Sequence, residues 1–418
     1  MAKKASTSRY GIKGEKLKVG ESYNKALGLY VYRWTDKFGE RHQISRKKLT
    51  DLREQEKKIE RDLADGIRMG EQNITLNDVF EVWVKDKVGL KDNTKSNYVY
   101  MYRHFVQNTF GTLRIQEIRK SDVRRFYNTI IGEGRNKVLV STLESIHTVL
   151  HQVFNLAVED NYIRMNPSDG VLGECKRANN IEVPKRHALT IPEQTAFINY
   201  VKHTNKYKHW SPLFTFMLGT GCRIGEVAGL RWEDVHMETD NGWIDINHNL
   251  IYFKADGRKC ITQISSPKTA AGRRVIPLLP EVKQALLDEK SYQKEVGLTC
   301  SCTIDGYTDF IFLNRDGKNL NQQTVNRAIK RILRDYNTQE LDKAEKEGRI
   351  AVLLPNFSCH ILRHTFATRY CEIETNLKLI QKVLGHKDIS TTMDVYVDAT
   401  RDKLNESFEN LAGKIVIS

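Results

Sequence analysis

The spacing of apolar residues near the N-terminus predicts a small β-sheet followed by one helix. Residues 29–45 alternate between apolar and polar side chains around a turn at residues 36–39, which is the pattern of a β-hairpin. A weaker strand pattern lies at residues 16–23. Residues 51–69 are charged but repeat apolar side chains at helical spacing. The apolar positions of that expected helix are Leu52, Ile59 and Leu63.

Residues 74–170 show only helical periodicity, which predicts a compact all-helical domain. Each expected helix begins near a hydroxyl side chain that can accept a hydrogen bond from a backbone N–H. These expected capping residues are Thr75, Thr94, Ser121 and Ser141.

The rest of the chain indicates a linker and a mixed domain. Residues 166–185 are rich in turn formers and charge, which favours a linker, although an ordinary surface loop is the alternative. Residues 186–418 alternate long helical segments with one strand-rich stretch at 243–278. We therefore expect a multidomain α+β protein. Its expected parts are a small β-sheet-plus-helix domain at 1–72, an all-helical domain at 73–172, a linker at 173–185, and a mixed, mainly helical domain with a small β-sheet at 186–418.

The chain is basic, which favours a polyanionic partner. Lys and Arg number 66 against 52 acidic residues, a formal charge of +14. Residues 1–71 hold 18 basic and 11 acidic residues, half of that excess. Tyr30, Tyr32 and Trp34 alternate with basic residues, so one interpretation is a strand face set against DNA, and the other is a hairpin core with solvated basic edges. The candidate DNA-binding residues are Arg33, Arg41, Arg46, Lys47 and Lys48, with Lys176 and Arg177 of the linker.

Cysteine usage and hydropathy argue against a secreted or membrane protein. Seven cysteines, mostly far apart, do not form a disulfide framework and fit a reducing cytoplasm. Cys300 and Cys302 lack a second Cys/His pair at ligand spacing, so we expect loop cysteines rather than a zinc site. The chain shows no signal-peptide core and no apolar run long enough to span a bilayer, so no membrane partner is expected.

Two segments of the second half carry groups that can act on a phosphate. At residues 219–226, G-T-G-C-R-I-G-E, the glycines Gly219 and Gly221 permit a tight turn that brings Arg223 to a helix start, with Glu226 one turn later. That guanidinium can bind a phosphate while the carboxylate orients it. Residues 266–278 read as strand, turn and strand, with Lys268 at the tip, where it can protonate a leaving oxygen. Taken alone, these are more often a surface ion pair and a solvated lysine.

Two further segments follow. The stretch S-C-H-I-L-R-H-T-F-A-T-R-Y opens with a possible serine cap and places His360 and Arg363 on one helical face. In L-G-H-K-D-I-S-T-T-M-D-V-Y-V, a glycine ends one helix, His386 follows, and Tyr396 lies on a short helix. A lone histidine in such a helix is more often structural. The candidate caps of the last helix are Ser390 and Thr391.

Together the four segments resemble the tyrosine recombinase family. The matching features are the arginine of T-G-x-R-x-x-E, the hairpin lysine, H-x-L-R-H-T-F-A-T, L-G-H, and a tyrosine ten residues beyond that last histidine. The resemblance covers the whole second half, and the helical domain agrees in order and size. A basic N-terminal sheet makes the chain similar to integrases of conjugative transposons and temperate phages. The resemblance implies an arm-site-binding domain at 1–72, a core-binding domain at 73–172 and a catalytic domain at 186–418.

The resemblance also implies the role of each matching residue. Tyr396 matches the nucleophile, His360 the residue that assists as a base, and Lys268 the general acid that protonates the departing 5′-hydroxyl. Because charge develops on the non-bridging oxygens, fixed donors there stabilise the transition state. The residues that match the phosphate-binding positions are Arg223, Arg363 and His386, with Glu226 as the residue that positions Arg223. The motif neighbours His364, Arg369, Arg273 and Arg274 are expected to have structural or backbone-contacting roles.

The implied activity is integration and excision of a mobile element through a 3′-phosphotyrosine, without a metal or other cofactor. The implied partners are double-stranded DNA at core and arm sites, a homotetramer on DNA and an excisionase. The expected location is the bacterial cytoplasm, at the nucleoid. Residues 398–411 are helical in pattern and precede the tail K-I-V-I-S, which in the family docks on a neighbouring protomer; folding back in cis is the alternative.

Two rival functions share parts of this pattern. A type IB topoisomerase uses similar phosphate chemistry but acts as a monomer, and the separate basic N-terminal domain favours recombination instead. A DNA-binding regulator on a decayed recombinase scaffold is the non-enzymatic rival. It is disfavoured because every expected catalytic position carries the expected residue type.

Overall fold

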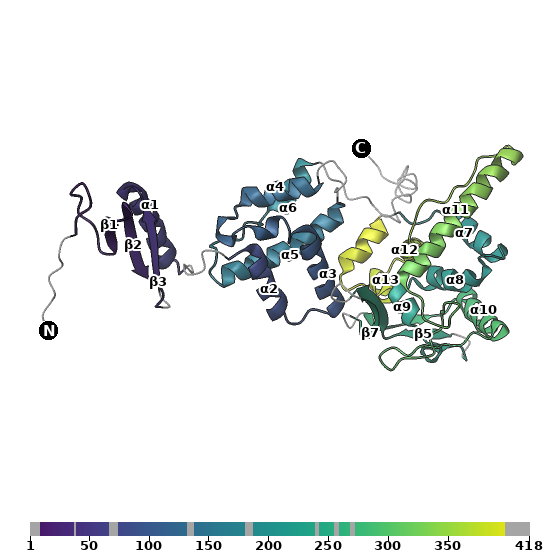
Figure 1. The fold of residues 1–418 in the computed structure, drawn as a ribbon. Coiled ribbons are helices and arrows are strands. Elements are labelled where there is room, and N and C mark those ends of the chain that lie inside the picture. Colours follow the sequence, from purple (N-terminus) through teal and green to yellow (C-terminus); the bar gives the residue numbers. More distant parts are fainter. Residues whose placement is uncertain are drawn as a thin grey trace, which may run out of the picture. The chain divides into compact units, whose positions relative to one another are not determined.

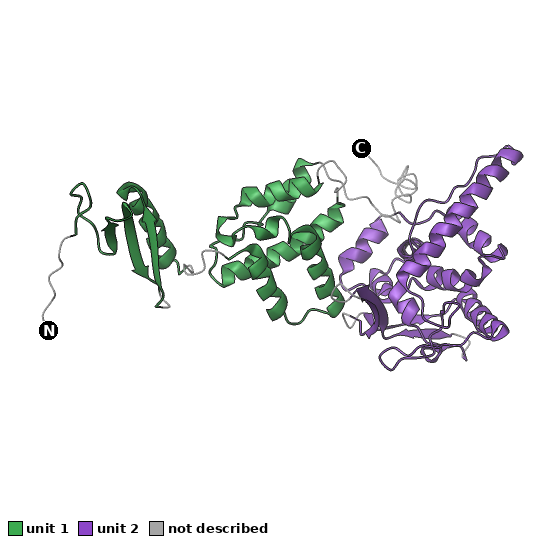
Figure 2. Ribbon diagram, viewed as in Figure 1, with its two compact units in different colours: residues 1–183 green, residues 184–418 purple. Residues whose placement is uncertain are grey.

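The structure is a computed structural model of the 418-residue chain. It forms two compact units, residues 1–183 and 184–418 (Figure 2). The division lies inside the segment that the sequence predicts as a linker. The residues described are 9–36, 39–66, 74–131, 138–179, 187–238, 242–254, 259–267 and 272–397. Among these residues, no helix is both long and apolar enough to cross a membrane.

The N-terminal part of unit 1 is an antiparallel sheet of order β1-β2-β3 with one helix (Figure 1). Its elements are β1 (Glu21–Asn24), β2 (Leu29–Thr35), β3 (Arg41–Arg46) and α1 (Leu49–Ala64). The predicted hairpin and helix are thus confirmed. The weaker strand lies later than expected, because residue 16 makes only an isolated bridge to Tyr10.

The two faces of this sheet differ in chemistry because side chains alternate along β2. Tyr30, Tyr32 and Trp34 are buried with Leu52 and Ile59 in the core below α1. Placing these aromatic residues on a DNA-facing surface is therefore wrong, since they supply the apolar face that lets so small a sheet fold. Arg33, between Tyr32 and Trp34 on β2, lies on the opposite, open face.

The second part of unit 1 is helical, as predicted. Its helices are α2 (Leu76–Asp86), α3 (Asp92–Phe105), α4 (Lys120–Ile131), α5 (Val140–Glu159) and α6 (Val171–Ala178), with 3-10 turns at Phe110–Thr112 and Ile115–Glu117. Its core contains Phe80 and Tyr102, whose rings stack with centroids 3.6 Å apart. The apolar residues of α5 complete this core.

One of the four predicted helix caps is confirmed. The Thr75 hydroxyl accepts from the Asp78 N–H, and Asp78 accepts from the Thr75 N–H, which is a full capping box. The other three helices begin two, one and one residues before the hydroxyl residue, so it lies inside the first turn and not at the cap. These wrongly predicted caps are Thr94, Ser121 and Ser141.

The predicted linker begins too early. Residues 173–178 belong to α6, and Val171 and Cys175, one turn apart on this helix, are buried in the core of the helical domain. The chain enters α6 through Gly170, which has a left-handed backbone with φ of +72°. The helical spacing of these two apolar residues, four positions apart, is a weak signal because glycines and charged residues surround them. Residues 180–186 lie outside the described part of the chain.

Unit 2 has one main hydrophobic core and smaller apolar clusters, with a three-stranded antiparallel sheet of order β4-β5-β8 and a separate β6–β7 hairpin. The strand-rich stretch predicted at 243–278 is confirmed. The strands are β4 (Val235–His236), β5 (Trp243–Ile246), β6 (Asn249–Lys254), β7 (Cys260–Ser265) and β8 (Arg274–Pro277). The helices are α7 (Ile191–His203), α8 (Ser211–Thr220), α9 (Ile224–Gly229), α10 (Pro280–Val296), α11 (Gln322–Glu347), α12 (Cys359–Ile373) and α13 (Leu377–Leu384).

The contrast between the caps gives a test. We expect Thr75→Ala to lower the opening free energy of α2 by about 1 kcal/mol, which is roughly fivefold faster amide exchange, because the capping box is lost. Hydrogen exchange measured on a peptide spanning residues 75–86 reports this change. Ser121→Ala is the matched control and should leave exchange of α4 within about twofold. Equal effects in both helices would contradict the assignment of caps.

Candidate active site

Arg223 is held at the junction of two helices. Helix α8 ends at Gly221, whose left-handed backbone has φ of +62°, and Arg223 is then the N-cap residue of α9. The predicted turn is thus confirmed at Gly221. Gly219 has a different purpose: it lies within α8, where a Cβ would meet Val282 Cγ2 at 2.3 Å. Its lack of a side chain lets α8 and α10 approach closely.

Glu226 is the common partner of two arginines. Its carboxylate accepts from Arg223 Nη1 (3.0 Å) and Arg274 Nη1 and Nη2 (3.0 and 2.8 Å). Burial by itself raises the pKa of Glu226, but the hydrogen bonds and charges of Arg274, followed by the charges of Arg223 and Arg363, outweigh it and lower the pKa to about 2. The carboxylate therefore stays ionised and holds positive charge at this place.

Three arginines meet the C-terminal turn of α13. Arg274 Nε donates to the carbonyl oxygen of Val383 (2.7 Å), Arg363 Nη2 to that of Leu384 (2.5 Å), and Arg223 Nη2 to that of Gly385 (3.1 Å). These three consecutive carbonyls are among those that have no partner within a helix. The turn thus gathers side chains that are up to 140 residues apart in sequence.

Arg363 is the most crowded of these cations. It is buried, and its Nη1 also donates to the carbonyl oxygen of Gly221 at 2.6 Å. Burial, followed by the positive charge of Arg223, lowers its pKa to about 9. Repulsion between guanidinium groups makes the site receptive to an anion, because a phosphate between them would relieve the unfavourable charge.

His386 follows directly on this turn and is also buried. Its Nδ1 lies 3.0 Å from the hydroxyl of Thr392. Burial, together with the charges of Arg363, Arg223 and Arg274, lowers the pKa of His386 to about 4. The ring is therefore neutral at neutral pH. When the Thr392 hydroxyl donates to Nδ1, the ring hydrogen lies on Nε2, which leaves a donor for a phosphate oxygen.

His360 and Tyr396 lie on the helices that adjoin this cluster. The rings of His360 and His364, one turn apart on α12, meet edge to face with centroids 4.8 Å apart. Tyr396 lies in the helical residues 389–397 and packs against the cluster of Ala367, Cys371, Ile380 and Leu384 from α12 and α13. Ser390 and Thr391 lie inside the first turn of that helix, so neither is its cap. Ser358 is at the N-cap of α12 without a side-chain bond, and Asn326 accepts from the Cys359 N–H instead.

Lys268 and the tail at residues 398–418 are outside the described residues. The predicted DNA-binding residues belong to unit 1. Arg33 and Arg41 share the open face of the N-terminal sheet, because they pair with Gln43 and Thr35 across β2 and β3. The exposed basic residues at the end of β3 and the start of α1 are Arg46, Lys47 and Lys48. On α6, Lys176 forms an ion pair with Glu144, and Arg177 is exposed.

Two residues of the cluster were not predicted as site residues. Arg274 was expected to be a structural neighbour, and Thr392 was unassigned. A signal for Arg274 was present, since β8 alternates and places a charged residue at a position that must face inward. No local pattern distinguishes Thr392 from its neighbours.

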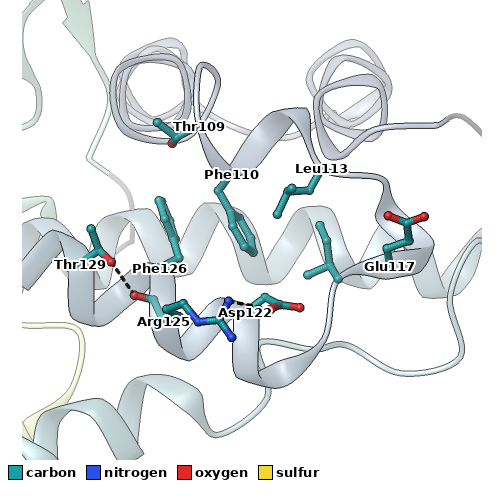
Figure 3. A pocket seen from close by; sticks show the side chains of 9 residues that line it. Thr109, Phe110, Leu113, Glu117, Asp122, Arg125, Phe126 and Thr129 are labelled. Atoms are coloured by element: carbon teal, nitrogen blue, oxygen red, sulfur yellow. Dashed lines mark hydrogen bonds and ion pairs between the residues drawn. The ribbon is translucent and has the colours of Figure 1, made fainter.

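Possible ligand sites outside this cluster have different chemistry. Among the described residues, one group of three potential metal ligands was found, Asp36, Glu40 and His42 of the N-terminal sheet domain. A hollow of about 470 Å³ in the helical domain is lined by Phe110 and Phe126, whose rings stack 4.7 Å apart (Figure 3). It belongs to unit 1 and contains none of the four predicted catalytic segments. A site that receives a phosphate from a rigid duplex needs an open surface rather than such a hollow.

The depressed pKa of His386 predicts a pH-dependent stability. The unfolded chain binds a proton at this residue below about pH 6.5, whereas the folded site does so only near pH 4, so unit 2 loses stability as the pH falls between these values. We expect His386→Gln to flatten the decline of the melting midpoint over this range. His203→Gln, at an exposed histidine of α7, is the control and should keep the wild-type slope. An unchanged slope for His386→Gln would contradict the neutral, buried state.

Comparisons with known proteins agree on one family. Residues 188–403 match the Phage integrase family, and residues 75–131 match the family's N-terminal SAM-like domain. The transposase from transposon Tn1545 of Streptococcus agalactiae is 29% identical over 422 residues, covering 97% of each chain. The transposase from transposon Tn916 of Enterococcus faecalis has the same identity and coverage.

Solved structures give the same result. The Tn1549 transposon integrase in complex with transposon right end DNA has a TM-score of 0.68 and 26% identity, covering 81% of this chain and 100% of that chain. A lambda integrase tetramer bound to a Holliday junction shares the fold, with a TM-score of 0.52 at 17% identity and coverage of 91% and 95%. The family match extends over more than half of the sequence. The chain therefore belongs to the phage integrase family of tyrosine recombinases.

Proposed function

We propose that this enzyme integrates and excises a mobile element of the conjugative transposon type by cleaving and rejoining DNA through a 3′-phosphotyrosine. The observation that carries the proposal is the convergence of Arg223, Arg363 and His386 on one turn of α13. Support for the type of element comes from the relatives, which are transposases of transposons, and from an integrase solved with circular intermediate DNA.

The chemistry follows from the charge that develops during attack on a phosphodiester. In our proposal, Arg223 and Arg363 bind the non-bridging oxygens, and neutral His386 donates from Nε2. These donors are fixed before DNA arrives, so they stabilise the transition state without a large reorganisation. Glu226 orients Arg223, because it accepts from both the side chain and the backbone N–H of that residue.

The covalent step needs a nucleophile, a base and an acid. We assign the nucleophile to Tyr396, whose oxygen forms the bond to phosphorus while the bond to the 5′-oxygen breaks. His360 takes the phenolic proton, and Lys268 gives a proton to the departing 5′-hydroxyl. Rejoining reverses these steps with the 5′-hydroxyl of a partner strand. The phosphotyrosine conserves the energy of the broken bond, so the reaction requires no high-energy cofactor.

Assembly and site recognition belong to the same proposal. Exchange of two duplexes needs four nucleophiles, so we propose a homotetramer on DNA, with residues 398–418 docking on a neighbouring protomer and an excisionase setting direction. Helices α2 to α6 bind the core site and the N-terminal sheet binds the arm site. The enzyme works in the bacterial cytoplasm, at the nucleoid.

The covalent intermediate gives the direct test. Wild-type protein mixed with nicked duplex from the ends of its element, in EDTA, should give an SDS-resistant protein–DNA complex. Tyr396→Phe should give none while binding the duplex within about threefold, because only the attacking oxygen is lost. Tyr370→Phe, at a tyrosine of the same packing cluster, should still form the complex. Covalent complex from Tyr396→Phe would refute the assignment, and binding without any complex from wild type would favour the DNA-binding regulator.

The open face of the N-terminal sheet gives a second test. We expect Arg33→Gln with Arg41→Gln to weaken arm-site binding by about tenfold, since two phosphate contacts and their counterion release are lost. Covalent complex formation at the core site should stay within about twofold. The matched control is Arg61→Gln with Lys57→Gln on α1, which carries equal charge loss on the helix. Equal weakening by both pairs would show a general charge effect and contradict recognition through the sheet.

A further inference from the structure

We propose that Arg274 is a positioning residue for strand cleavage: it ties Glu226 of α9 to the C-terminal turn of α13 and so fixes the spacing of the phosphate-binding groups. This inference rests on the proposed function. It assigns to Arg274 a part in the reaction that none of the sequence motifs assigns to it.

The bonds of Arg274 join three separate elements. The residue begins β8, its Nη1 and Nη2 donate to the two oxygens of Glu226, and its Nε donates to the Val383 carbonyl oxygen in α13. A further bond from Nη1 reaches the Gly272 carbonyl oxygen at 3.3 Å, in the segment that enters β8. A planar guanidinium can make all these bonds at once because its donors point in fixed directions.

Burial separates Arg274 from Arg223, one of the two proposed phosphate-binding arginines. Its side chain is 1% exposed, whereas that of Arg223 is 40% exposed. The Glu226 carboxylate and backbone carbonyls already accept from every nitrogen of the Arg274 guanidinium. Arg223, by contrast, has exposed surface with which to meet DNA. Arg274 therefore acts on the reaction through the groups that it holds.

The C-terminal turn of α13, which Arg274 contacts, also contacts Arg223 and Arg363 and leads directly into His386. Val383, Leu384 and Gly385 each accept from a different arginine, and His386 is the next residue. Without Arg274, the Val383 carbonyl oxygen loses its side-chain donor and Glu226 loses half of its hydrogen bonds. Fewer bonds then hold Arg223 and Arg363 in place against their mutual repulsion. A displacement of about 1 Å at such a site costs about 100-fold in rate.

The test compares Arg274→Met and Arg274→Lys in the full-length protein. We expect the single-turnover rate of covalent complex formation at saturating protein to fall about 100-fold in Arg274→Met, with the dissociation constant for the duplex within about threefold. Arg274→Lys keeps the charge but cannot bridge Glu226 and Val383 together, so it should recover only part of the rate. A cleavage rate that falls from wild type to Arg274→Lys to Arg274→Met, with unchanged DNA binding, would indicate a positioning role. If Arg274 bound the phosphate directly, the substitutions would weaken DNA binding as well.

Arg231→Met is the matched control. Arg231 is also largely buried and binds a carboxylate, Asp234, through Nε and Nη2, but it contacts none of the three carbonyls of the α13 turn. It should lower the melting midpoint as much as Arg274→Met while keeping the cleavage rate within about threefold. An unchanged rate in Arg274→Met, or an equal rate loss in Arg231→Met, would overturn the inference. If wild type also forms no covalent complex while binding DNA, the proposed function itself has failed.

Discussion

A single buried carboxylate determines how positive charge is arranged in unit 2. Three guanidinium groups cannot share a small, poorly hydrated volume without a counter-charge. Glu226 supplies it, and because two arginines bind its two oxygens, it also sets their orientation. The positive charge that Glu226 does not compensate would attract an anion, as the proposed phosphate-binding role requires. Replacing Glu226 by a neutral group would therefore disturb geometry as well as charge.

The C-terminal turn of α13 contributes the second half of this arrangement. Helix carbonyls at a C-terminus are short of partners and carry the negative end of the helix dipole, so they attract cations. Here three of them accept from side chains that come from β8, α9 and α12. These backbone carbonyls thus hold the arginines in place without further acidic side chains. Additional acidic side chains would repel DNA.

The sequence predicted much of this molecule because its strongest signals are local. Alternation in β2, helical periodicity in residues 74–170 and the turn at Gly221 all depend on near neighbours, and all are confirmed. Boundaries depend on more than near neighbours: the sequence predicts three helix caps one or two residues too late and places most of α6 in the linker. For α6 the deciding factor is tertiary, because Val171 and Cys175 are buried in the core of the helical domain.

Long-range contacts limited the site prediction in the same way. Arg274 Nε donates to the Val383 carbonyl oxygen, and the Thr392 hydroxyl contacts His386 Nδ1, but no spacing in the sequence reveals those pairs. Thr392 has a consequence of its own, because it lies one turn before Tyr396 on the same helix and its hydroxyl meets His386. Any displacement of that helix would therefore move the Tyr396 side chain and break the contact between Thr392 and His386 at the same time.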